Sequence, residues 1–151
     1  VCLVIMSDLE QQAEEIEALS AIFPDEFKLL EGAEKEEYFK KFSHWEKEKI
    51  TNVVTVQLQP QEPDAEGKIH VGAILIAAMV QDYPSSSSII FEIESKKGLS
   101  PDQIEEGKAA CTTIAEENVG MPIIFMLTSS IQDWLQENNI PGHDGSMYAD
   151  M

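Results

Sequence analysis

Cysteine and histidine, which often serve as nucleophiles, bases or metal ligands, are few in this 151-residue chain. Two cysteines, Cys2 and Cys111, are too few for a disulfide framework or a metal cluster. His44, His70 and His143 are scattered along the chain, so no Ser–His–Asp or His–Cys arrangement is indicated. Cys111 falls on the apolar stripe of a predicted helix, which is typical of a small core residue. We therefore predict no catalytic residue, no cofactor and no metal site.

The charge of the chain indicates a protein partner. The formal net charge is −18, and every basic residue is a lysine. An acidic chain repels polyanions and arginine dominates phosphate recognition, so we expect no direct contact with nucleic acid. A basic protein surface is the natural partner, although an acidic shell that serves only solubility explains the same charge. We also expect no membrane span and no signal peptide, which favours a reducing, cytoplasmic location.

Residues 80–94 give the clearest structural signal. An apolar run ends at Tyr83 and Pro84, four serines follow, and residues 89–94 then alternate between apolar and polar. Pro84 cannot donate to a sheet ladder, so the first strand must end there, and the alternation predicts a second strand. The ring of Tyr83 at the turn needs a place to pack, either as a structural latch or also as part of a contact.

The elements that position this turn follow from periodicity. Ser7 and Glu10 form a capping box for an amphipathic helix that ends at Pro24. Its buried side is predicted to carry Leu9, Ala13, Ile16, Leu19, Ile22 and Phe23, with Glu10, Glu14, Glu15 and Glu17 on the solvent side.

Strands are predicted at residues 27–30, 53–58, 69–80 and 89–94, and helices near Ser100 and Met121. The fold class is therefore α+β: a helix, a four-stranded antiparallel meander and two C-terminal helices.

Residues 31–51 interrupt the strand pattern. Lysines and glutamates alternate there with aromatic residues, so the local charge nearly cancels. The segment is predicted to be a long inserted loop, with at most a helical turn, that adds little to the core. On this interpretation a domain without residues 31–51 still folds, and Trp45→Ala costs less stability than Trp134→Ala.

Three segments resemble the RWD domain family. They are residues 14–27, the pair Tyr83–Pro84, and residues 116–125 with the amphipathic stretch that follows. In order, they span nearly all of residues 8–138. Ser88 stands where the family's tyrosine–proline motif has its second proline.

The resemblance implies a fold like that of ubiquitin-conjugating enzymes, without the catalytic cysteine. It implies a non-catalytic protein-interaction module, with residues 7–138 as the domain. Residues 1–6 are then an extension or a cloning remnant, and residues 139–151 a tail or linker. The implied structural residues are Tyr83, Pro84, Ser88 and Gly120, and the implied partner-binding residues are Tyr83, Glu116, Asp133 and Glu137.

Within the family, residues 43–47, 97–100 and 134–139 resemble the N-terminal RWD domain of the amino-acid-starvation kinase of translation initiation factor 2 alpha. That branch implies docking on a large, ribosome-associated HEAT-repeat activator, in the stress-response control of translation. The full-length protein would then be a serine/threonine kinase. The alternative is the RWD domain of a ubiquitin ligase or of a ubiquitin-conjugating-like protein, and the oligomeric state is left open.

Overall fold

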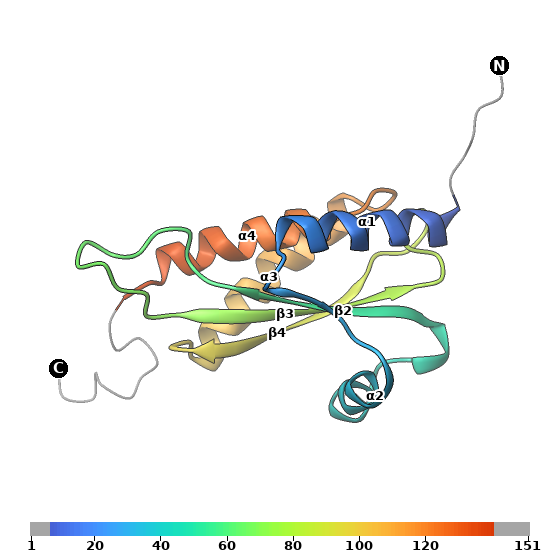
Figure 1. Cartoon of the computed structure of the whole chain (residues 1–151), viewed down its shortest axis with the longest axis horizontal. Helices are drawn as coiled ribbons and strands as arrows, with labels where there is room; N and C mark the ends of the chain where they lie inside the picture. The colour runs from blue at the N-terminus through green and yellow to red at the C-terminus, as the bar shows by residue number, and fades with distance from the viewer. Residues whose placement is uncertain (1–6, 141–151) are drawn as a thin grey trace, which may run out of the picture.

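A four-stranded antiparallel sheet forms the centre of the structure, a computed structural model that describes residues 7–140 (Figure 1). The strands are β1 (Phe27–Leu29), β2 (Ile50–Leu58), β3 (Gly72–Val80) and β4 (Ile90–Lys97). Their order across the sheet is β1-β2-β3-β4, and each pairs antiparallel with the next. The predicted meander and the α+β class are therefore confirmed.

Helices cover both faces of this sheet. They are α1 (Asp8–Ile22), α2 (Gly32–Lys41), α3 (Pro101–Glu117) and α4 (Ile124–Glu137). Figure 1 shows α1, α3 and α4 on one face of the sheet and α2 on the other. Within the described residues, no helix combines the length and the apolar character that crossing a membrane requires.

The predicted helix starts follow from local capping. The Ser7 hydroxyl accepts from the Glu10 N–H at 3.1 Å, and Ser100 accepts from Gln103 at 3.2 Å, each with the reciprocal bond of a capping box. The last helix begins at Ile124, beyond the predicted start at Met121. Cys2, His143, residues 1–6 and the predicted tail from residue 141 onward lie outside the described residues.

Several strand limits differ from the predictions. The second strand begins at Ile50, three residues before the predicted start at Val53, while β1 ends at Leu29 and β4 begins at Ile90, each one residue from its predicted limit. The third strand begins at Gly72, three residues after the predicted start at Ile69. The fourth continues to Lys97, three residues beyond its predicted end at Glu94, and the chain turns at Gly98, whose φ is +74°. A Cβ there would lie 2.1 Å from the His70 carbonyl oxygen, so a side chain at this position would clash.

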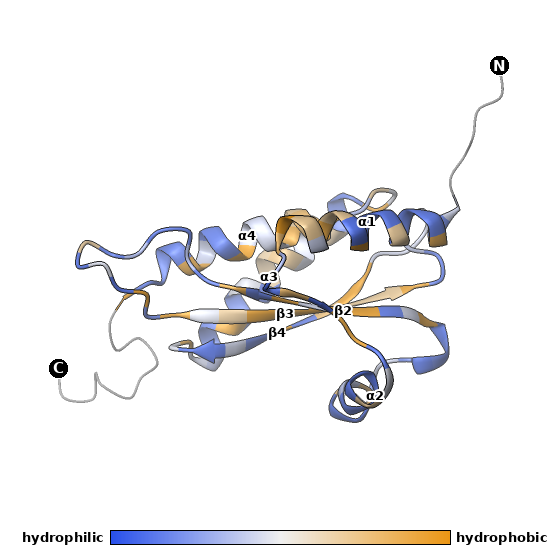
Figure 2. Cartoon of the chain, in the orientation of Figure 1, coloured by the Kyte–Doolittle hydropathy of each residue, from blue (hydrophilic) through white to orange (hydrophobic). Residues whose placement is uncertain are grey.

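The larger core lies between the sheet and the layer of α1, α3 and α4. Gly107 permits the close packing of α3 on α4, because a Cβ there would lie 3.1 Å from the Trp134 ring. Figure 2 shows apolar residues along β2 and β3 and over the C-terminal half of α1. The C-terminal half of α1 also lines a groove that is described below.

A second core occupies the opposite face of the sheet, and the prediction of a loop that adds little to the core is wrong. Residues 31–51 contain α2, a 3-10 turn (Lys47–Lys49) and the first two residues of β2, and Trp45 is only 6% exposed. The physical reason is that β3 is apolar on both faces: Leu75 and Ile76 are fully buried in opposite cores. The second cluster consists of Leu30, Trp45, Ile50, Val53, Ile76 and Ala78, with Tyr38, Phe39 and Phe42 packed against it.

Helix α1 is rotated relative to its predicted orientation. Gln12, Glu15 and Leu19 are its buried residues, whereas Leu9 and Ile22, which were predicted to be inside, are exposed. Two polar side chains occupy the buried face because polar groups beneath them need partners. The contacts of Glu15 show this most clearly.

Candidate docking surface

Tyr83 joins three elements through its hydroxyl group. Its side chain is 1% exposed, and the hydroxyl donates to Glu15 Oε1 at 2.7 Å. The hydroxyl oxygen of Tyr83 also accepts the Ile123 N–H at 2.8 Å, while Glu15 Oε2 accepts the Ile124 N–H at 3.0 Å. We call these four residues, Glu15, Tyr83, Ile123 and Ile124, the latch.

The latch forms because α4 begins without a capping side chain of its own. The first N–H groups of a helix have no partner within the helix, and the N-cap residue Ile123 cannot supply one. Glu15 of α1 supplies the oxygen from another helix, and negative charge is also favourable at a helix N-terminus. The latch therefore fixes both the start of α4 and the rotation of α1.

Burial determines the protonation behaviour of the latch. Desolvation raises the pKa of Glu15, partly offset by the hydrogen bonds from Tyr83 and Ile124. Burial, and then the neighbouring Glu15 carboxylate, raises the pKa of Tyr83 far above its usual value, so the hydroxyl stays protonated and donates. The latch interpretation of Tyr83 fits this geometry. Because the ring is enclosed, a partner would not contact Tyr83 directly. Tyr83 would affect binding only by stabilising the fold.

The raised pKa of Glu15 predicts how its contribution to stability changes with pH. A carboxyl with a higher pKa in the folded state stabilises the fold most below its unfolded pKa, and this advantage is lost as the pH rises through the folded pKa. The stability of the wild type relative to Glu15→Gln should therefore fall as the pH rises above about 4.5. Urea titrations of both proteins at a series of pH values measure this, and a relative stability that rises with pH would contradict it.

The turn after β3 is held by further contacts from α1 and from the loop before α4. Gln12 Nε2 donates to the carbonyl oxygens of Val80 and Tyr83, at 2.7 and 2.9 Å. The Gly120 N–H donates to the Pro84 carbonyl oxygen at 2.9 Å, and the Tyr83–Pro84 peptide bond is cis. The structure thus brings Tyr83, Pro84 and Gly120 of the predicted motif together.

The remaining predicted residues lie apart from the latch. Ser88 follows the turn, and its hydroxyl oxygen is buried without a hydrogen-bond partner. Glu116 is exposed near the end of α3, and Asp133 and Glu137 are exposed one turn apart on α4. The exposed positions of these three acids suit contact with a partner, and their role in binding stays a prediction.

Two of the three helices on one face of the sheet, α1 and α4, carry acids but no lysine. All lysines lie between residues 28 and 108, so neither α1 nor α4 carries a basic residue. On the opposite side, lysines around α2 pair with acids: Lys47 lies 3.1 Å from Glu36, and Lys41 pairs with Glu94. We call the exposed side of α1 and α4 the acidic helical face.

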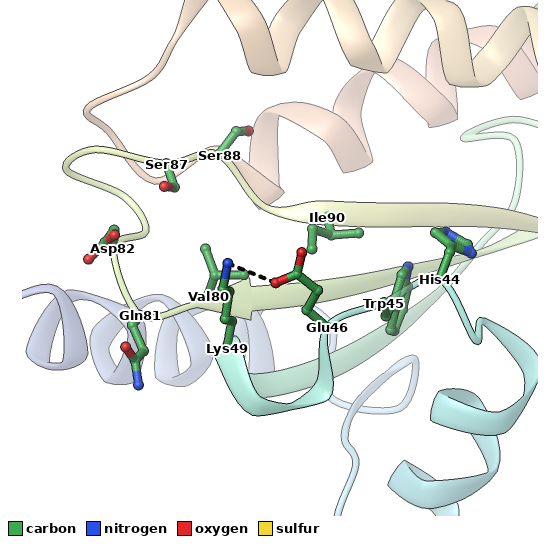
Figure 3. Close-up of a pocket in the computed structure, with 10 residues that line it drawn as sticks. All are labelled: His44, Trp45, Glu46, Lys49, Val80, Gln81, Asp82, Ser87, Ser88 and Ile90. Carbon is green, nitrogen blue, oxygen red and sulfur yellow. Dashed lines mark ion pairs between the residues drawn. The ribbon is translucent and has the colours of Figure 1, made fainter.

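A pocket of about 480 Å³ lies on the opposite side of the sheet from this face, between the segment after α2 and the β3–β4 turn (Figure 3). Lys49 and Glu46 form an ion pair in it, at 2.7 Å. Figure 3 shows His44 at one end and Ser87 at the other, so the imidazole does not lie against the serine hydroxyl. The unpartnered Trp45 Nε1 and Ser88 Oγ are sealed from solvent, so neither is available to a ligand.

The other residues considered for chemistry have surroundings that indicate structural roles. Cys111 is fully buried, and burial raises the pKa of its thiol to about 11, which disfavours the nucleophilic thiolate. His70 Nε2 lies 2.7 Å from Asp64, and His44 lies 3.5 Å from Glu92. Residues 7–140 contain no cluster of three or more His, Cys, Asp or Glu side chains that could hold a metal ion.

Comparisons with known proteins indicate the family of this chain. The sequence matches the family model of the RWD domain over residues 10–135. It is 26% identical to E3 ubiquitin-protein ligase RNF25 of Bos taurus over 127 residues, which are 84% of this chain and 25% of that protein. It is 30% identical to the Protein IMPACT homolog of Caenorhabditis elegans over 132 residues, 87% of this chain and 39% of that protein. The chain therefore spans less than half the length of these relatives.

A solved structure shares the fold. The solution structure of the RWD domain of mouse GCN2 superposes with a TM-score of 0.70 at 24% sequence identity. The match covers 94% of this chain and 95% of that one. The observed sheet and helices therefore have the RWD fold. The helix α2 and the second core are part of the same chain.

Proposed function

Because this chain belongs to the RWD domain family, we propose that it is a non-catalytic docking domain for the ribosome-associated HEAT-repeat activator of the amino-acid-starvation pathway. The RWD domain is a protein-interaction fold, and the enclosed Cys111 suits a domain without thiol chemistry. We place this docking in the cytoplasm, in the control of translation under stress.

The acidic helical face is the observation that carries this proposal. A helical-repeat protein presents rows of helices, and a basic row would meet the lysine-free α1 and α4. Complementary charge speeds association and disfavours wrong partners. The resemblance to the starvation-kinase branch, the IMPACT homolog and the RWD domain of mouse GCN2 give further support.

Charge reversal on α4 tests the proposal. Asp133→Lys with Glu137→Lys should leave the fold intact, because both side chains are exposed. It should weaken binding to a recombinant HEAT-repeat fragment of the activator at low salt by about tenfold or more, mainly through slower association. Kinetics measured on an immobilised fragment give both rates. The difference between the proteins should shrink in salt, because exposed charges are screened within about 10 Å at 0.1 M.

The matched control reverses two acids on the other side of the sheet. Glu37→Lys with Glu48→Lys changes the net charge equally, and both residues are exposed, in α2 and in the 3-10 turn that follows it. This variant should bind nearly as well as the wild type. The proposal fails if the wild type does not bind the fragment, and the α4 contact is refuted if both reversals weaken binding equally.

A second candidate function is supported by the match to RNF25. Its printed name is that of a ubiquitin ligase, and it aligns with 84% of this chain. In such a protein the domain would recruit another protein to the ligase. Sequencing the transcript beyond Met151 distinguishes the candidates, since a kinase domain supports the first and a ligase domain the second.

A further inference from the structure

We propose that a groove between α1 and the start of α4 binds an amphipathic helix with basic flanks, contributed by a protein partner. The groove has a volume of about 330 Å³, and its apolar lining includes Ala18, Leu19, Ile22, Pro122 and Phe125. This inference rests on the proposed function, and it adds the chemistry of the partner and the place where its helix binds.

The groove follows one side of α1. Gln11, Glu15, Ala18 and Ile22 line it, and they recur at intervals of three and four residues. From Gln11 to Ile22 a helix rises about 16 Å, which is the length of about three turns. A partner helix that lays its apolar side into a groove uses anchors at the same spacing, so the dimensions match.

Two of the apolar side chains that line this groove are well exposed. Ile22 and Phe125 are each 50% exposed, from two different helices. Val119 and Met121, in the loop that leads into α4, are exposed as well. Scattered apolar residues are normal on a surface, whereas exposed apolar side chains from two helices that line one groove indicate an interaction site.

The latch accounts for the exposure of Ile22. Glu15 faces the start of α4 to accept from Tyr83 and Ile124, and this fixes the rotation of α1. Ile22 then lies at the rim, half out of the core, although the apolar periodicity of the helix predicts it inside. The buried hydrogen bonds and the groove are therefore parts of one arrangement.

Charge selects the occupant. Glu14 lies in the groove lining, and neither helix carries a lysine. A second copy of this chain would place one acidic helical face against another, which like-charge repulsion disfavours. An amphipathic helix with Lys or Arg beside its apolar stripe fits this site. Its apolar stripe would pack in the groove, and its basic side chains would lie beside the acids at the rim.

The test removes the apolar contact without adding charge. Ile22→Ser with Phe125→Ser should weaken binding of the 151-residue chain to the HEAT-repeat fragment by about tenfold or more, as loss of central apolar anchors does. Leu9→Ser is the matched control, because Leu9 is 58% exposed on the same helix and does not line the groove. It should leave the affinity close to that of the wild type, and circular-dichroism melts verify that all variants fold.

The outcomes separate this inference from the proposed function. Wild-type binding that survives Leu9→Ser and is lost in the double serine variant supports the groove. If the wild type binds and the double variant binds equally well, the groove inference is overturned while the docking function stands. If the wild type itself does not bind the fragment, both the proposed function and this inference are contradicted.

Discussion

Replacing Tyr83 with alanine should cost about 3–5 kcal/mol of stability, the range for truncating a large buried aromatic side chain. The ring is 1% exposed, so its removal leaves a cavity in the larger core. The hydroxyl is lost as well, which leaves the Ile123 N–H and the Glu15 carboxylate without their shared partner. Urea titration followed by circular dichroism measures the loss in the free energy of unfolding.

Tyr83→Phe is the control that separates the ring from the hydroxyl. It keeps the packing and removes only the two hydrogen bonds, so it should cost about 1–3 kcal/mol, the penalty for buried groups left unsatisfied. Glu15→Gln disturbs the same network, so its effect and that of Tyr83→Phe should not add. A cost for Tyr83→Ala no larger than that of Tyr83→Phe would show that the ring is not part of the core.

Trp45→Ala and Trp134→Ala should destabilise the domain by similar amounts, each about 3–5 kcal/mol. The two side chains are 6% and 7% exposed, although they lie on opposite faces of the sheet. Trp45 lies against Phe42, with ring centroids 4.8 Å apart, in the cluster that contains Ile76. This replaces the sequence-based expectation that Trp45 contributes far less. Denaturant titrations of the two variants provide the comparison.

Removal of residues 31–51 gives a related result. Without α2 and Trp45, one face of the sheet, including Ile76 and Ala78, would meet water. Exposed apolar strands favour association, so the shortened chain should aggregate or lose a cooperative melt. A cooperative melt close to that of the wild type would contradict the role of the second core.

The elements that local signals specify were predictable from the sequence. Ser7 and Ser100 each have a reciprocal partner three residues later, and both helices begin there. Pro84 prevents the third strand from continuing because it cannot donate to the sheet. In each case the residues that decide the structure are close together in the chain.

The incorrect predictions concern features that depend on contacts between residues far apart in the sequence. The cover for the second face of β3 comes from aromatic residues dispersed among charges, so residues 31–51 resembled a loop. Glu15 resembled a solvent-facing acid, because its partners are 68 and 109 residues away. One available signal was that the phenol of a buried Tyr83 needs a hydrogen-bond partner. The sequence does not show that the partner lies on α1.

Mapping the bound surface in solution tests the docking account most directly. Amide chemical shifts of the isotope-labelled chain are recorded before and after adding the unlabelled HEAT-repeat fragment. The account predicts that the largest changes fall on α1, on the loop before α4 and on the exposed side of α4, including Ile22, Phe125 and Asp133. Changes centred on α2 and the pocket beside Trp45, or no changes at all, would contradict it.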